Sequence, residues 1–72
     1  MPHLPVISGD EFVKAVRKIG YEVDQIEGSH MILVCPGRNR ISVLRHKALG
    51  RGLLRALIRD IGLTRDEFIN LL

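Results

Sequence analysis

His30 follows Gly28 and Ser29 and stands at the head of a long stretch that carries basic side chains and no acidic ones. From residue 28 to residue 59 the chain has no Asp or Glu. Its Lys and Arg residues there are Arg38, Arg40, Arg45, Lys47, Arg51, Arg55 and Arg59. The segments on either side are net acidic, so the overall charge of +3 understates the local positive charge. Segregated positive charge attracts phosphates. The pattern therefore predicts a bound polyanion beside one group that can transfer a proton.

A single histidine among cations suits the cleavage of RNA. RNA carries its own nucleophile, the 2′-hydroxyl, and an imidazole near neutral pH can take the proton of that hydroxyl or give a proton to the leaving 5′-oxygen. Nearby Arg or Lys side chains would stabilise the charge that develops on phosphorus. One such proton-transfer group typically contributes about 10²–10⁴-fold to the rate. DNA lacks the 2′-hydroxyl and should resist this mechanism.

Other kinds of catalytic site find little support in the sequence. His30, His46 and Cys35 do not have the short spacings of zinc ligands. The basic stretch offers no carboxylate for Mg²⁺. The chain has neither a phosphate-binding P-loop nor the glycine motif of dinucleotide-binding proteins. We therefore expect neither a metal nor a cofactor.

Several residues near the histidine are candidates for RNA contact. A positive φ is predicted for Gly28, and a glycine would also let a phosphate come close. Ser29 could donate to a phosphate oxygen or simply close the turn. His46 is a rival acid or base, although a phosphate contact or a helix cap is the favoured interpretation for it. The basic candidates near or on the following helix, whose N-terminus also favours anions, are Arg45, Lys47, Arg51 and Arg55.

A first helix is expected over residues 9–19. Ser8 and Glu11 have the form of a capping box, in which each side chain bonds the backbone N–H of the other residue. Apolar residues follow at helical spacing, and Gly20 is placed to end the helix in a left-handed conformation.

A second, amphipathic helix is expected to end at Gly62, and a second capping box at residues 64–67 is expected to begin a short terminal helix. The apolar side of the second helix is formed by Leu54, Leu57, Ile58 and Ile61. A second side carries a cationic stripe, with arginines four residues apart at Arg51, Arg55 and Arg59.

Three strands are expected between these helices, at residues 21–26, 30–35 and 40–44. Their hairpin spacing predicts an antiparallel meander. The first strand alternates and should have one face in water, whereas the second is apolar throughout. Its phase stays open: either Met31 and Leu33 pack under the helices and leave Ile32 outside beside the histidine, or the reverse holds.

The order α-β-β-β-α with a short C-terminal helix predicts an α+β fold of two layers, with a three-stranded antiparallel sheet, and matches the double-stranded RNA-binding fold. The length predicts one domain over residues 1–72. A single cysteine cannot form an intramolecular disulfide, and neither a signal peptide nor a membrane span is evident. We therefore expect a cytoplasmic protein without a membrane partner.

Over nearly its full length the chain resembles the HicA (YcfA-like) toxins of bacterial and archaeal toxin–antitoxin pairs. The resemblance is carried by residues 4–9, Gly20-Tyr21, Gly28-Ser29-His30, Arg45-His46-Lys47, residues 52–55 and residues 63–68. Two positions depart from the family pattern. Leu44 stands where a proline is common, and Met31 stands where larger or basic residues often occur.

The resemblance implies a toxin of a type II toxin–antitoxin pair, an mRNA-cleaving ribonuclease with His30 as its catalytic residue. It also implies a HicB-type antitoxin that covers the active surface. The residues alone leave two alternatives open, a module that holds structured RNA without cutting it and an adaptor that binds a protein through an outer aliphatic face.

Overall fold

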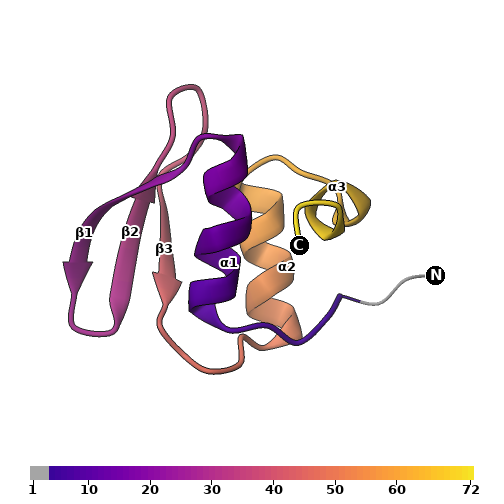
Figure 1. The fold of residues 1–72 in the computed structure, drawn as a ribbon, viewed down its shortest axis with the longest axis horizontal. Helices are drawn as coiled ribbons and strands as arrows, with labels where there is room; N and C mark the ends of the chain where they lie inside the picture. The colour runs from indigo at the N-terminus through magenta and orange to yellow at the C-terminus, as the bar shows by residue number, and fades with distance from the viewer. Residues whose placement is uncertain (1–3) are drawn as a thin grey trace.

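The computed structural model describes residues 4–72 and consists of a three-stranded sheet with helices packed beside it (Figure 1). In chain order the elements are α1 (Gly9–Val16), a 3₁₀ turn η1 (Arg17–Ile19), β1 (Glu22–Glu27), β2 (His30–Val34), β3 (Ile41–Leu44), α2 (Arg51–Asp60) and α3 (Arg65–Ile69). This is the expected α+β arrangement, with α3 as the added terminal helix. Residues 1–3, on which the expectation of no signal peptide partly depends, lie outside the described residues.

The first helix begins as its capping box predicts. The Glu11 N–H donates to the Ser8 hydroxyl and the Ser8 N–H donates to the Glu11 carboxylate, each at 3.0 Å. α-Helical bonding ends at Val16, earlier than the expected residue 19, because the last turn tightens into a 3₁₀ turn. Gly20 then reverses the chain with a φ of 106°, as predicted.

The sheet is the predicted antiparallel meander, in the order β1-β2-β3. Met31 and Leu33 are 4% and 0% exposed, so this side of β2 faces the helices. Neighbouring side chains on a strand point to opposite faces, which places His30 and Ile32 on the open face of the sheet. The structure thus selects the first of the two possible phases of β2.

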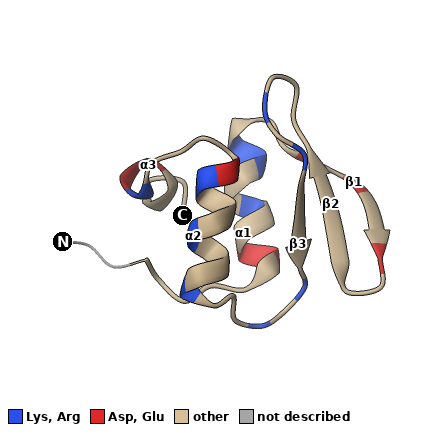
Figure 2. Ribbon diagram, turned by 180° about the vertical axis from the view of Figure 1, so that it is seen from behind, with Lys and Arg blue, Asp and Glu red and all other residues tan. Residues whose placement is uncertain are grey.

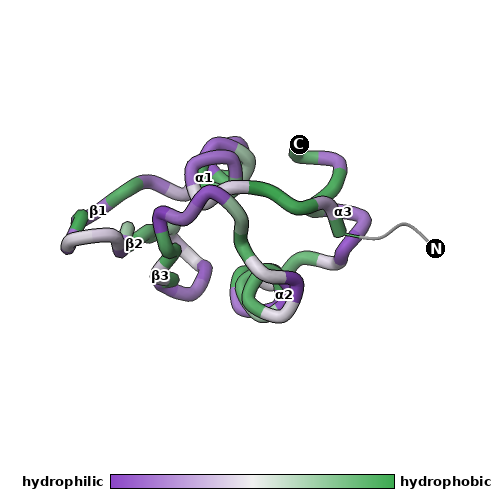
Figure 3. The backbone as a smooth tube through the Cα atoms, turned by 90° about the horizontal axis from the view of Figure 1, so that it is seen from below, coloured by the Kyte–Doolittle hydropathy of each residue, from purple (hydrophilic) through white to green (hydrophobic). Residues whose placement is uncertain are grey.

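The prediction that β1 is half-buried is wrong, because all six of its residues are exposed. A bulge between Val23 and Gln25 brings Val23 and Ile26, opposite the buried Leu33 and Met31, to the helix-facing side. The helices do not reach that far: α1 and α2 lie next to β3, and β1 is the strand farthest from both (Figure 3). Val23 and Ile26 therefore stay 38% and 56% exposed.

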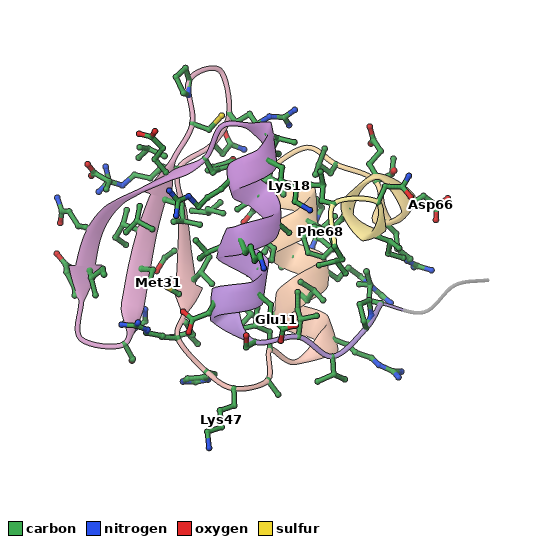
Figure 4. The ribbon with its side chains drawn as sticks, in the orientation of Figure 1. Glu11, Lys18, Met31, Lys47, Asp66 and Phe68 are labelled. Atoms are coloured by element: carbon green, nitrogen blue, oxygen red, sulfur yellow. The ribbon has the colours of Figure 1, made fainter. Side chains whose placement is uncertain are left out.

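Aliphatic side chains from the helices and the sheet form most of the core, and a pair of aromatic rings packs among them. The Phe12 and Phe68 rings stack with centroids 5.3 Å apart. Phe68 points from α3 toward the two longer helices (Figure 4), and both rings are fully buried. This contact fixes α3 against α1.

The connection between β2 and β3 holds the C-terminal end of α2. The Arg38 guanidinium donates to the Ile61 carbonyl, and the Asn39 side chain donates to the Asp60 carbonyl at 2.8 Å. Such carbonyls have no partner inside the helix. The Tyr21 hydroxyl in turn donates to the Asn39 carbonyl at 2.8 Å, and burial raises the pKa of this phenol. Arg38 is therefore a structural residue, although it lies in the basic stretch.

Among residues 4–72, no helix has the length and apolar character needed to cross a membrane.

Candidate active site and RNA interface

The Gly28-Ser29 turn leaves His30 at the exposed end of β2. Gly28 has a φ of 61°, as predicted, and Ser29 does not share this left-handed conformation. A two-residue hairpin turn with glycine in its first position has this form. A Cβ atom at Gly28 would meet nothing within 4 Å. The backbone of the turn is therefore open to an approaching ligand.

A serine from β3 lies beside the imidazole of His30. The Ser42 Oγ is 3.5 Å from His30 Nδ1, at the outer limit of a hydrogen bond. Both side chains are exposed. A hydrogen bond between the Ser42 hydroxyl and Nδ1 would limit rotation of the imidazole ring. Sequence reasoning missed Ser42, because only the pairing of β2 with β3 brings positions 30 and 42 together.

Glu27 is the second neighbour that sequence reasoning missed. It lies opposite His30 where β1 and β2 meet at the turn, and directly opposed residues of an antiparallel pair project to the same face. A carboxylate therefore shares the open face with the imidazole. The two-residue turn alone could have predicted this pairing, because the residues that flank such a turn always face each other.

The basic loop between β3 and α2 is bonded to the histidine turn. The Arg45 N–H donates to the Ser29 carbonyl at 2.7 Å, and the His46 carbonyl accepts from the Gly9 N–H at 2.9 Å. Gly9 lies so close that a Cβ atom there would be 2.1 Å from the Leu44 carbonyl oxygen. The start of α1, the basic loop and the Gly28-Ser29 turn are thus held in one place.

The basic stretch itself contains no acidic residues, but the fold places acidic residues from elsewhere in the chain beside it. The Arg45 Nε is 3.5 Å from an Asp10 carboxylate oxygen, and Arg40 is 3.6 Å from Asp24. Both acids come from the first third of the chain, which the fold places beside the later arginines. The side chains of both pairs are at least 41% exposed, and exposed pairs contribute only about 0–1 kcal/mol. Arg45 can therefore exchange Asp10 for a phosphate at little cost.

His46 and Lys47 form the exposed outer part of the basic loop. Lys47 extends away from the body of the molecule (Figure 4). The His46 backbone is tied to Gly9, while its ring is exposed. They are the two residues that follow Arg45, whose N–H donates to the Ser29 carbonyl of the turn.

The arginines of α2 were expected to contact RNA near His30, but they lie on a different part of the molecule. Arg51 begins α2, and Arg55 lies one turn on. Arg55 lines two hollows whose other walls come from Leu4, α2 and residues 63–65, with none from the sheet. The structure therefore groups Gly28, Ser29, His30 and the basic loop, and it does not bring Arg55 to the histidine. Within residues 4–72, no three His, Cys, Asp or Glu side chains gather where they could hold a metal.

A family model described as the HicA toxin of bacterial toxin–antitoxin matches residues 9–63. The chain belongs to the HicA toxin family. The matched part of this HicA-family protein includes the histidine turn, the basic loop and α2, and it stops before α3. Neither the curated proteins nor the solved structures compared with the chain gave a match.

Proposed function

We propose that this HicA-family protein is an endoribonuclease that cuts mRNA without a metal ion, as the toxin of a type II toxin–antitoxin pair. His30 is the general acid or base. One observation carries the proposal: the hydrogen bond from the Arg45 N–H to the Ser29 carbonyl joins the turn that bears His30 to the basic loop. A proton-transfer group and phosphate-binding cations thereby share one exposed site.

The reaction uses the 2′-hydroxyl of the RNA as its nucleophile. His30, acting as base, takes the proton of this hydroxyl while the 2′-oxygen forms a bond to phosphorus and the bond to the 5′-oxygen breaks. Water then protonates the leaving 5′-oxygen. Acting as acid, the protonated ring would instead give a proton to the leaving 5′-oxygen, and water would take the proton of the 2′-hydroxyl. The products are a 2′,3′-cyclic phosphate and a free 5′-hydroxyl. Ser42 orients the ring, and the phosphate contacts beside it come from Gly28, Ser29, Arg45, His46 and Lys47. Arg51 and Arg55 would contact the RNA strand farther along α2.

The partner in this proposal is a HicB-type antitoxin that covers the open face of the sheet. This face carries His30 and the half-buried Ile32 and Val34. Val23 and Ile26 of β1 are also exposed, but they lie on the other side of the sheet and are not part of this face. A protein that packs on this apolar surface would also cover the imidazole.

The test is cleavage of a long mRNA in the presence of EDTA. The wild type should cut the RNA and leave a DNA of the same sequence intact, and His30→Ala should cut about 10²–10⁴-fold more slowly. His46→Ala is the comparison variant, because His46 is the other exposed histidine of this site. It removes only a phosphate contact and should slow cutting less than His30→Ala does. Equal cutting by the wild type and His30→Ala would disprove the mechanism. RNA binding without any cutting would favour the non-catalytic alternative.

A further inference from the structure

A chain of basic residues continues from the histidine turn along α2 and ends at arginines, Arg59 and Arg65, that the proposed function does not use. Blue segments follow one another from the end of β3, through the basic loop, and then up α2 (Figure 2). The residues are Arg45, Lys47, Arg51, Arg55 and Arg59, and all are exposed. The ion pairs of Arg40 with Asp24 and of Arg45 with Asp10 include no residue of α2.

The far end of this chain is a shallow site built by three arginines from two helices. Arg55 and Arg59 of α2 and Arg65 of α3 line one hollow of about 270 Å³ together with Leu4, Ile58 and Leu63. A smaller hollow beside it is lined by Leu4, Arg51, Arg55 and Arg65. Among residues 4–72, neither hollow has an Asp or Glu in its lining. Arg55 and Arg65 belong to both, so the two hollows form one cationic surface.

The spacing of the α2 arginines fits a ligand with a regularly repeated negative charge. Residues four apart on a helix are separated by about 6 Å along its axis, which is comparable to the distance between successive phosphates of a single RNA strand. Like charges at this spacing oppose helix formation, so the stripe adds nothing to the stability of α2. Guanidinium groups also match phosphate oxygens in shape and can bind them through two hydrogen bonds.

The same surface is poorly suited to a protein partner. Most of the apolar floor of the larger hollow is closed, because Leu4 and Ile58 are only 6% and 5% exposed and Leu63 is half-buried. Protein interfaces draw most of their affinity from large side chains that enter an apolar pocket. A phosphate backbone needs only the charged rim, which is the part that is accessible here.

We propose that the face formed by Arg55, Arg59 and Arg65 is a distal binding site for the phosphate backbone of the RNA strand, reached along Lys47 and Arg51 from His30. This inference rests on the proposed function only in taking RNA as the ligand. It assigns a role to Arg59 and to Arg65. A long RNA contacts both the histidine turn and the distal site, whereas an RNA of two or three nucleotides reaches only one of them.

The test measures RNA binding in a His30→Ala background, so that cleavage does not enter. Arg55→Gln with Arg59→Gln removes two cations from the distal site. Lys14→Gln with Arg17→Gln is the matched control, since it removes two exposed cations from α1 and η1. Binding of a single-stranded RNA of about 15 nucleotides is followed over a series of salt concentrations, and thermal unfolding confirms that both pairs fold.

The slope of log K against log salt should become shallower by about 1.4 in the Arg55/Arg59 pair, because each lost single-strand phosphate contact contributes about 0.7. The control pair should keep the parent slope. A trinucleotide that spans the His30 turn should bind the Arg55/Arg59 pair and the parent alike. An unchanged slope, an equal change in both pairs or an equal loss for the trinucleotide would overturn the proposal. An unchanged RNA slope with weakened antitoxin binding would overturn it in favour of a protein contact.

Discussion

Replacing Gly9 by alanine should destabilise the protein and disturb the site, because α1 begins against the backbone that follows β3. The added Cβ would lie 2.1 Å from the Leu44 carbonyl oxygen and 3.2 Å from the Arg45 Cα. Both are backbone atoms, so no side chain can rotate out of the way. The helix start and the end of β3 must instead move apart by roughly 1 Å.

The expected cost has two parts. Forcing extra volume into a packed site costs about 1–3 kcal/mol. The movement also strains or breaks the 2.9 Å hydrogen bond from the Gly9 N–H to the His46 carbonyl, which contributes about 1 kcal/mol. We expect a loss of about 2–4 kcal/mol in unfolding free energy. For a domain of this size that lowers Tm by roughly 10–30 °C.

Gly52→Ala is the matched control. Gly52 lies in the first turn of α2, is exposed, and has no atom within 4 Å of its added Cβ. Alanine there should stabilise the protein by about 0.5–1 kcal/mol, because it lowers the entropy of the unfolded chain and favours the helix. Thermal unfolding followed by circular dichroism measures both variants. A Gly9→Ala protein that melts within 2 °C of the wild type would refute the reasoning.

Three further predictions concern single side chains. Ser42→Ala should lower the cleavage rate about tenfold without changing Tm, and Ser42→Thr should restore the rate; a rate that is unaffected in Ser42→Ala would remove Ser42 from the site. Tyr21→Phe should cost about 1 kcal/mol at pH 7 through loss of the bond to Asn39. Burial raises the folded pKa of this phenol above its ordinary 10.0, so the advantage of the wild type should be complete below pH 10 and shrink as pH rises through the folded pKa. Urea unfolding at several pH values measures this difference in stability. A difference that stays constant as pH rises through the folded pKa would contradict the prediction. Hydrogen bonds from Thr64 hold the pKa of Glu67 below 4.5. Glu67→Ala should therefore lower Tm at pH 7, and the difference in Tm from the wild type should shrink as pH falls through the folded pKa. A difference in Tm that persists below the folded pKa would contradict the capping role of Glu67.

The parts of the fold that short-range chemistry specifies could be predicted from the sequence. Ser8 with Glu11, and Thr64 with Glu67, form the capping boxes that their spacing indicates. Gly20 and Gly28 have the positive φ expected of them. Each of these features depends on residues no more than three positions apart. The hairpin spacing likewise predicted the meander.

Most of the features that prediction missed depend on distant contacts; the pairing of Glu27 with His30 is the exception, because the turn between them specifies it. The exposure of β1 depends on how far the helices extend over the sheet, which the alternation of its own residues does not encode. The Arg45–Asp10 pair joins residues 35 positions apart, so a count of charge along the chain could not reveal it. Ser42 reaches His30 only through the pairing of β2 with β3.

The central claim is that His30 cuts RNA through the 2′-hydroxyl of the substrate. Its most direct test is single-turnover cleavage of a short RNA with one mapped cut site, in EDTA, with ribose or 2′-deoxyribose at that position. We predict a product that ends in a 2′,3′-cyclic phosphate, a rate at least about 100-fold lower for His30→Ala, and no cutting of the 2′-deoxy substrate. Cleavage of the 2′-deoxy substrate at the same rate, or cleavage that stops when EDTA is added, would contradict the claim.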